Sequence, residues 1–491
     1  THFKFPEDHG SFARATLRCV GVGKCRRLNG TPHDDTMCPS FMVTREERHS
    51  TRGRAHLLWE MLRREGVPVE GGWRDESVKE ALDLCLSCKG CKGDCPVNVD
   101  MATYKAEFLS HYYDGRVRPR HAYAFGLIDR WARWASVAPN LVNLVTQTPG
   151  LARLAKGLAG MAPERSIPAF APETFRAWFQ RRGAKPARGT KVVLWPDTFN
   201  NHFYPDTARA AVEVLEHLGF DVEIPSRPLC CGRPLYDYGM LDRAKAYLEE
   251  VLTVLGPYVS AGTPLVVLEP SCCAVFRDEM PALLPNRNEA KSLSRQTFLL
   301  SEFLAQSPRP RLPILRRAAV VQGHCHHKSV LEFEHERESL ERMQLDARVL
   351  SSGCCGMAGS FGFEADKYDV SLACGERSLL PEVRGQSRQT LVIANGFSCR
   401  TQIAQTTERE ALHLAEVMKL ALDYGPSGPP IEGAPETPVV ERRKRELRRG
   451  RKLLALRAAL ALGAIAGATL WWHRRHAVAP RSKGLFHAFT G

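Results

Sequence analysis

The sequence predicts a mixed fold of the α+β and α/β classes, in which a helical N-terminal domain precedes two repeated α/β subdomains. Three observations lead to this prediction. Residues 1–100 are rich in cysteine and loop-forming residues, apolar strands alternate with amphipathic helices after residue 190, and a pattern of adjacent cysteines occurs twice. Strands that alternate with helices indicate parallel sheets. The repeat is too long for a solenoid unit, so it indicates duplicated subdomains that face each other.

The N-terminal domain is expected over residues 1–125. Its clearest helix is predicted over residues 44–65, where Arg48, Arg52 and Arg54 alternate with leucine and tryptophan. Alternation of this kind indicates an amphipathic helix with one buried face. The arginines could pair with carboxylates on the helix surface, dock a partner, or raise the reduction potential of a nearby anionic centre.

Composition divides the rest of the chain. A helical, aromatic connector ends at a boundary rich in Pro and Gly, and a Pro/Gly-rich linker after the second subdomain leads into a basic run. We place the connector, the two subdomains, the linker with its basic run, an apolar stretch and the tail at residues 126–189, 190–310, 311–425, 426–452, 453–472 and 473–491.

Length and charge exclude several classes of protein. The chain has 491 residues, of which 44% are apolar and 25% charged, as in soluble globular domains. Most of the net charge of +14 lies after Glu441 and does not spread over a domain, so we expect no nucleic-acid partner. The sequence opens with Thr1 and not Met, and we expect a processed chain or the C-terminal part of a longer protein.

The 16 cysteines are predicted to stay reduced. They form CxxCxxC and CC groups in a long chain without a signal peptide, whereas disulfide-rich secreted proteins are usually short. Adjacent cysteines also bridge poorly to each other. We therefore expect thiolate ligands of metals or clusters in a cytoplasmic protein.

The stretch CLSCKGCKGDCP carries the most specific motif. Cys85, Cys88, Cys91, Cys95 and Pro96 match the C-x2-C-x2-C-x3-C-P spacing of bacterial ferredoxin-type [4Fe–4S] sites at every position. Three of these thiolates bind one cluster, and in two-cluster proteins the fourth binds the other cluster. A zinc site is the alternative, because CxxC pairs also suit zinc. The complete run followed by proline favours an iron–sulfur domain.

A second, incomplete motif could supply the other cluster. Cys19 and Cys25 hold the first and third positions of a C-x2-C-x2-C run with Val22 in the middle, and a CP element follows later. The crossing rule gives the first cluster Cys38, Cys85, Cys88 and Cys91, and the second Cys19, Cys25 and Cys95. Three thiolates suit a [3Fe–4S] cluster, or a [4Fe–4S] cluster with a further ligand such as His33. The alternative is a vestigial loop without metal.

The apolar stretch at residues 453–472 supports two interpretations. As a helix it would match the hydrocarbon core of a bilayer, about 30 Å thick. Trp471 and Trp472 stand where interfacial aromatic residues are common, and the basic run before the span would keep the main body in the cytoplasm. We therefore expect attachment to the inner face of the cytoplasmic membrane. The alternative is an amphipathic or disordered basic tail, because Arg457 interrupts the apolar run.

The order of motifs resembles the C-terminal half of FAD-linked oxidases, the D-lactate, glycolate or D-2-hydroxyglutarate dehydrogenase-like proteins with a fused iron–sulfur region. The resemblance covers about residues 1–420 and rests on RCVGVGKCR, CPSFMVTREERHSTRGRAHLL, CLSCKGCKGDCP, WPDTFNN, CCGMAGSFGFE and NGFSCRTQI. It implies that FAD, on a domain or partner outside this sequence, oxidises a 2-hydroxy acid. This chain would then carry the electrons away.

The repeated cysteines resemble the CCG domain of heterodisulfide reductase subunits and of iron–sulfur subunits of flavin-linked dehydrogenases. The family motif joins a Cys on the first strand, a CCG and a late C-x2-C. The first unit keeps Cys230, Cys231 and Cys272, with Thr198 and Glu269 in place of two family cysteines. The second unit keeps Cys325, Cys354, Cys355 and Cys399, with Gly396 in the remaining position.

This pattern makes the second unit the better candidate for a metal or cluster. His324, His326 and His327 flank Cys325 as further ligands or proton relays, although three adjacent histidines cannot all face one site. The first unit is expected either to bind metal or to be kept only for packing.

Together these features predict the iron–sulfur electron-transfer portion of a flavin-linked 2-hydroxy-acid dehydrogenase. The acceptor would be a quinone if the tail is a membrane anchor, or a soluble carrier if it is not. The chain has no flavin or nicotinamide fingerprint, so FAD is expected elsewhere. Two alternatives stay open: a zinc-stabilised scaffold, and a thiol-disulfide enzyme that uses the CC pairs. The replaced cysteines argue against the second.

Overall fold

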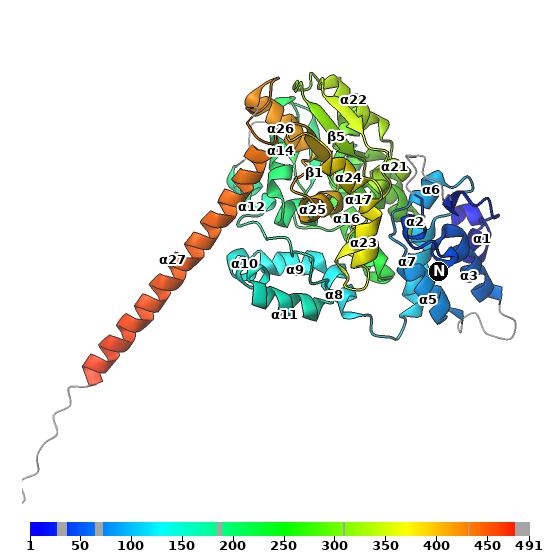
Figure 1. The fold of residues 1–491 in the computed structure, drawn as a ribbon, viewed down its shortest axis with the longest axis horizontal. Coiled ribbons are helices and arrows are strands. Elements are labelled where there is room, and N and C mark those ends of the chain that lie inside the picture. The colour runs from blue at the N-terminus through cyan, green and yellow to red at the C-terminus, as the bar shows by residue number, and fades with distance from the viewer. Residues whose placement is uncertain (27–36, 64–71, 184–188, 308–309, 431, 477–491) are drawn as a thin grey trace, which may run out of the picture.

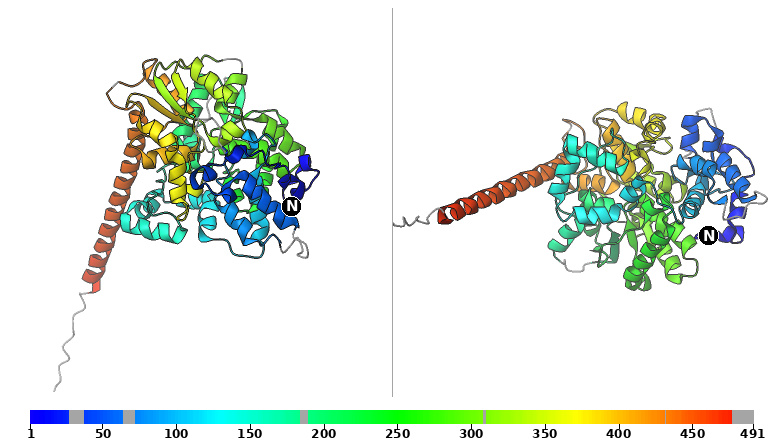
Figure 2. Two further views of the ribbon diagram at one scale, coloured as in Figure 1. Left: turned by 45° about the vertical axis from the view of Figure 1, so that its right-hand side comes forward. Right: turned by 90° about the horizontal axis from the view of Figure 1, so that it is seen from below.

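Figure 1 shows a computed structural model of the chain, which describes residues 1–26, 37–63, 72–183, 189–307, 310–430 and 432–476. Helices dominate the described residues, and two small parallel sheets lie among them. The mixed fold predicted from the sequence is confirmed. The N-terminal domain lies on one side of the two α/β subdomains, and a long C-terminal helix leaves from the other side (Figures 1 and 2).

The N-terminal domain packs short helices around the cysteine-bearing loops. Asp100 caps the longest buried helix, α7, because its carboxylate accepts the backbone N–H of Thr103 at 3.1 Å. The ring of Phe12 meets Tyr104 of α7 edge to face, with centroids 5.7 Å apart. The helices are α1 (Phe12–Thr16), α2 (Pro39–Thr44), α3 (Thr51–Arg63), α5 (Glu76–Asp83), α6 (Gly90–Asp94) and α7 (Met101–Tyr112).

The helix predicted over residues 44–65 is wrong at its start. α2 ends at Thr44, Arg45 adopts a left-handed conformation with a φ of 59°, and a 3-10 turn follows before α3 begins at Thr51. The break has a local cause, because it brings the backbone N–H of Thr51 to 2.9 Å from the Sγ atom of Cys38. The predicted C-terminal end falls beyond the described residues of α3.

The connector is helical, as its sequence predicts. Its elements are α8 (Arg120–Gly126), α9 (Ile128–Ala135), α10 (Pro139–Gln147), α11 (Pro149–Ala159) and α12 (Phe175–Arg181). Large apolar side chains remain exposed on α9 to α11, among them Trp134, Leu144 and Leu154. The connector therefore has an apolar outer surface.

The first α/β subdomain contains a parallel sheet with the strand order β2-β1-β3-β4. Its strands are β1 (Lys191–Trp195), β2 (Asp221–Glu223), β3 (Leu265–Val267) and β4 (Thr297–Leu299). Its helices are α13 (Thr198–His202), α14 (Pro205–His217), α15 (Arg233–Asp237), α16 (Leu241–Ser260), α17 (Pro270–Ala274), α18 (Met280–Leu283), α19 (Asn288–Gln296) and α20 (Leu300–Gln306), with a π-helical turn at Val275–Glu279.

The second α/β subdomain repeats this plan with the strand order β6-β5-β7. Its strands are β5 (Ala318–Gln322), β6 (Asp346–Val349) and β7 (Leu391–Ala394). Its helices are α21 (Cys325–Ser329), α22 (Glu334–Arg342), α23 (Tyr368–Glu376), α24 (Leu379–Arg384), α25 (Phe397–Thr406) and α26 (Leu414–Tyr424). In both units the central strands are buried, and the late cysteine follows a strand at its carboxyl end, where parallel sheets place ligands.

The C-terminal helix α27 (Thr437–His476) starts on the body and then projects into solvent (Figure 1). Near its start Arg443 donates to Glu416 of α26 at 3.0 Å and lies over the ring of Tyr204. Within the described residues, no helix is both long and apolar enough to cross a bilayer. The side chains at positions 457, 458 and 461–463 lie outside that description, so the membrane helix at residues 453–472 stays a prediction.

Candidate functional site

The ferredoxin loop buries its four cysteines around α6. Cys85, Cys88, Cys91 and Cys95 are each 7–8% exposed. Ser87 and Lys89 adopt positive φ angles of 52° and 57°, so the loop turns sharply between the cysteines. A side chain at Gly93 would come within 2.7 Å of the carbonyl oxygen of Ser329 in α21, so glycine permits close contact with the second subdomain.

Backbone amides point at two of these sulfur atoms. Met101 donates its N–H to the Sγ of Cys91 at 3.4 Å, and Thr51 donates its N–H to the Sγ of Cys38 at 2.9 Å. Such bonds stabilise negative charge on sulfur and raise the reduction potential of a bound cluster. The thiol of Cys38 lies close to both Cys25 and Cys91, as the predicted crossed arrangement of ligands requires.

A small cavity joins the three cysteines predicted for the second cluster. Cys19, Cys25 and Cys95 all line it, together with Arg52. A hydrogen bond from the Cys38 thiol lowers the pKa of Cys25 to about 6, which favours a thiolate at this position. The structure brings the incomplete motif together, and the proposed fourth ligand, His33, lies outside the described residues.

The second CCG unit gathers its four thiols in one buried group. Cys325 starts α21, Cys354 and Cys355 follow β6, and Cys399 lies in α25. A hydrogen bond with Cys354 lowers the pKa of Cys325 to about 7. Hydrogen bonds from Cys354 and Cys399 hold the pKa of Cys355 well below its ordinary value. These environments favour thiolates, the form that binds metals.

The first CCG unit also gathers its cysteines, but as thiols. The Sγ atoms of Cys231 and Cys272 lie 3.0 Å apart, and the hydroxyl of Thr198 is 3.7 Å from the Sγ of Cys230. A hydrogen bond with Cys231 raises the pKa of Cys230 well above its ordinary value. Although a hydrogen bond from Cys231 opposes the shift, burial raises the pKa of Cys272 to about 12.

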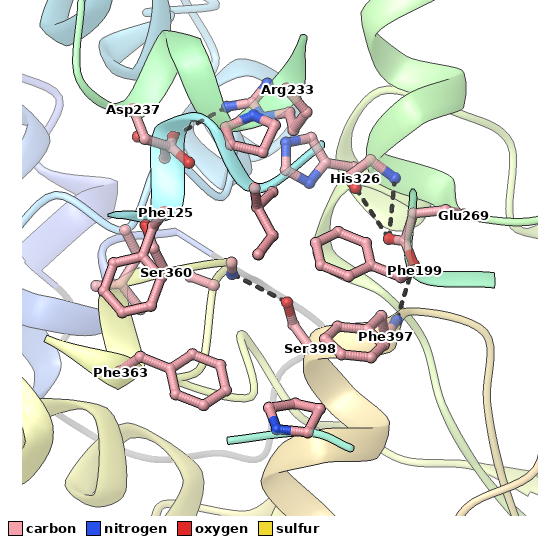
Figure 3. A pocket seen from close by; sticks show the side chains of 18 of the residues that line it. Phe125, Phe199, Arg233, Asp237, Glu269, His326, Ser360, Phe363, Phe397 and Ser398 are labelled. Atoms are coloured by element: carbon pink, nitrogen blue, oxygen red, sulfur yellow. Dashed lines mark hydrogen bonds and ion pairs between the residues drawn. The ribbon is translucent and has the colours of Figure 1, made fainter. Parts of the chain in front are cut away.

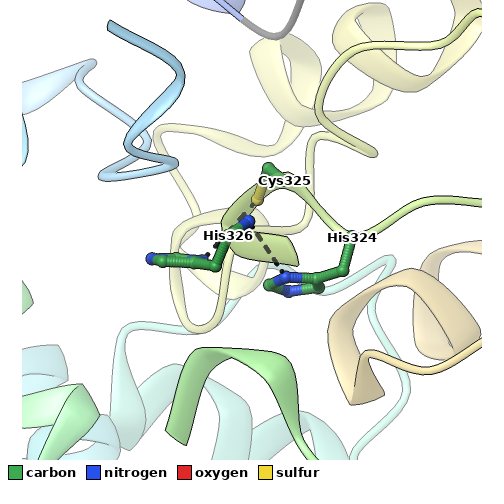
Figure 4. A group of neighbouring side chains, drawn as sticks. All are labelled: His324, Cys325 and His326. Carbon is green, nitrogen blue, oxygen red and sulfur yellow. Dashed lines mark hydrogen bonds between the residues drawn. The ribbon is translucent and has the colours of Figure 1, made fainter. Parts of the chain in front are cut away.

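Two of the three histidines beside Cys325 face the same space. Figure 4 shows His324 and His326 on either side of Cys325; their rings stack with centroids 5.3 Å apart, and the three side chains could hold a metal ion. His327 packs on Phe333 instead, with ring centroids 4.7 Å apart. A side chain at Gly396 would meet the His324 ring at 2.2 Å, which explains why glycine replaces the family cysteine there.

Comparison with known proteins agrees with these sites. The 4Fe-4S dicluster domain matches residues 15–99, and the Cysteine-rich domain matches residues 197–277. The chain carries a ferredoxin-type dicluster domain and a cysteine-rich CCG domain. The convergent, buried thiols of the dicluster domain fit iron–sulfur clusters, and the matched Cysteine-rich domain is the first of the two CCG units.

The relatives are oxidoreductases or parts of them. D-2-hydroxyglutarate dehydrogenase of Pseudomonas putida is 28% identical over 448 residues, covering 82% of this chain and 43% of that protein. Glycolate oxidase iron-sulfur subunit of Escherichia coli is 23% identical, covering 82% and 94%. One subunit of the anaerobic glycerol-3-phosphate dehydrogenase of Escherichia coli is 26% identical, covering 57% and 72%. The chain, an iron–sulfur oxidoreductase component, spans less than half the length of the D-2-hydroxyglutarate dehydrogenases that it matches.

A buried charge network beside the dicluster domain was not anticipated from the sequence. Lys89, between two cysteines of the ferredoxin loop, is 1% exposed, and its Nζ lies 3.1 Å from carboxylate oxygens of both Asp100 and Glu279. It also pairs with Asp278, which Lys92 contacts as well. Although burial opposes ionisation, the two ammonium groups hold the pKa of Asp100 well below its ordinary value. The network ties the ferredoxin loop to the first CCG unit.

Replacing Lys89 by methionine is expected to destabilise the chain by about 3–5 kcal/mol, because it leaves buried carboxylates without their central cation. Lys79→Met is the matched control, since Lys79 pairs with the exposed Glu76 and its loss should cost about 1 kcal/mol or less. Unfolding midpoints in urea, compared at equal iron content, measure the difference. Equal midpoints for the two variants would show that the network adds no stability.

Proposed function

We propose that this chain is the iron–sulfur electron-transfer portion of a flavin-linked 2-hydroxy-acid dehydrogenase. It would pass electrons from FAD, held on another domain or subunit, toward a quinone or another acceptor. The names of its relatives support this proposal, because D-2-hydroxyglutarate, glycolate and lactate are all 2-hydroxy acids.

One observation carries the proposal. Cys88 of the ferredoxin loop packs in a single buried group with Cys325 and Cys354 of the second CCG unit. Leu86 and Phe361 complete that group and keep water away. Two predicted redox sites far apart in the sequence therefore lie side by side, as electron transfer between them requires.

The residues of the chain would set the properties of these centres. When bound, an iron–sulfur cluster accepts and releases single electrons. The thiolates would hold it, the N–H groups of Thr51 and Met101 would donate to sulfur, and the apolar surroundings would limit solvent access. Arg54 does not dock a partner, because it is buried and donates to the carbonyl oxygen of Ala81 at 2.7 Å.

Anaerobic reduction of the purified chain tests the proposed function. The protein is expected to contain iron and sulfide, and dithionite or photoreduced FMN should bleach its visible absorption. Chelation of the iron should abolish this response, and Cys273→Ala, a buried thiol outside the predicted ligand sets, should leave it unchanged. Zinc without iron would support the scaffold alternative, and thiol-disulfide activity that survives iron removal would support the other; either result would overturn the proposal.

A further inference from the structure

A cavity lies where the ferredoxin loop, the connector and both CCG units meet (Figure 3). It encloses about 1090 Å³, part of it open to solvent, which is ample for the ring of an organic cofactor or substrate. Cys88 of the ferredoxin loop and Cys325 of the second unit both line it. An occupant would therefore lie beside both predicted redox sites.

The walls of this cavity are aromatic. Phe199 and Phe397 stack with ring centroids 4.2 Å apart and an interplanar angle of 15°, one ring from each CCG unit. Phe125 of the connector lies across the cavity from them (Figure 3). Aromatic rings at such positions bind planar, conjugated ligands by offset stacking.

Polar groups are few and point to specific atoms of a ligand. His326 is 6% exposed, and its Nε2 has no hydrogen-bond partner among the described residues, although the side chain lines the cavity. Ser398 lines the cavity as well, and its Oγ accepts the N–H of Gly359 at 2.9 Å (Figure 3). A buried nitrogen without a partner is costly, and a ligand carbonyl oxygen would remove that cost if the nitrogen carries a hydrogen.

A second, polar cavity adjoins the first. The two share Ser87, Asp237 and Ser360 in their linings. Charged side chains of Asp83, Lys105 and other residues line the remainder of the polar cavity. Water in the polar cavity would give protons a route to the apolar one.

We propose that the aromatic cavity binds the ring of a quinone and is the place where electrons leave the chain. This inference rests on the proposed function, which supplies the electrons from the 2-hydroxy acid. The quinone takes two electrons from the reduced centres and two protons from water, and its two carbonyl groups become the hydroxyl groups of a quinol. The exposed apolar face of the connector, with Trp134, Leu144 and Leu154, suits the approach of a lipid-soluble carrier.

The test measures binding and electron release separately. The oxidised full chain is titrated with menadione by calorimetry, and Phe199→Leu is expected to weaken binding about fivefold because it removes the stacking ring. Ser398→Ala, a smaller change, should also weaken it. Phe220→Leu is the matched control, because Phe220 packs on Phe303 at 4.8 Å and does not line the cavity.

The dithionite-reduced chain is then reoxidised with menadione or with ferricyanide, which accepts electrons at the protein surface. Phe199→Leu should slow reoxidation by menadione about fivefold and leave ferricyanide unaffected. Equal menadione affinity in all variants, with normal ferricyanide reoxidation, would overturn the cavity assignment alone. Cross-linking of an azidonaphthoquinone only to peptides outside the cavity would also overturn it. A chain that gives ferricyanide no electrons would overturn the proposed function instead.

Discussion

Replacing Cys91 by serine is expected to remove one cluster, or about four iron atoms per chain. Cys91 is buried, and its Sγ accepts the N–H of Met101, so no nearby side chain can take its place. Iron and sulfide analysis on anaerobically purified protein measures the loss. EPR spectra before and after dithionite show which centre disappears.

The same measurement decides whether the incomplete motif binds a cluster. Cys19→Ser should remove only the second centre, leaving the signal that Cys91→Ser abolishes. About seven to eight iron atoms in the unmodified chain would fit two centres, and about four would fit one. If Cys19→Ser changes neither iron content nor spectra, the cavity of Cys19, Cys25 and Cys95 holds no cluster.

Replacing Cys355 by serine is expected to remove metal from the second CCG unit, whereas Cys231→Ser should leave the metal content unchanged. The two positions are equivalent in the repeat but differ in charge state. Neighbouring thiols hold the pKa of Cys355 well below its ordinary value, while burial holds the pKa of Cys231 well above it. Metals bind thiolates and must displace protons from thiols.

Iron and zinc per chain measure this difference, and Cys374→Ala controls for loss of a buried thiol from the same subdomain. Because the pKa of Cys325 is about 7, metal affinity of the second unit should fall as the pH drops below that value and protons compete for the sulfur. Metal lost equally from Cys355→Ser and Cys231→Ser would show that both units bind it. Metal lost from neither would show that neither does.

The sequence is most informative where the chemistry is local. The spacing of Cys85, Cys88, Cys91 and Cys95 predicts the ferredoxin loop because these ligands lie within one short turn. Alternating strands and helices likewise predict the two parallel sheets. The start of α3 at Thr51 could not be predicted in this way, because a sulfur–amide contact from Cys38 and the left-handed Arg45 break the amphipathic pattern.

Contacts between distant segments were beyond sequence reasoning. Nothing in the local pattern pairs Lys89 with Glu279, or Cys88 with Cys325. A lysine between two cysteines suggests an exposed loop charge, and the buried carboxylates that neutralise it come from a π-helical turn almost two hundred positions later. The aromatic cavity has the same origin, since its walls come from four separate parts of the chain.

Glu269 shows how a duplicated unit can become committed to its altered form. It stands where the family has a cysteine, and its carboxylate now accepts the backbone N–H of Phe397 from the other unit at 2.8 Å. Restoring cysteine there would leave that amide without its acceptor, and restoring it at Gly396 would strike His324. The divergence of the two copies is therefore hard to reverse one substitution at a time, because each lost ligand position has since acquired a role in joining the copies.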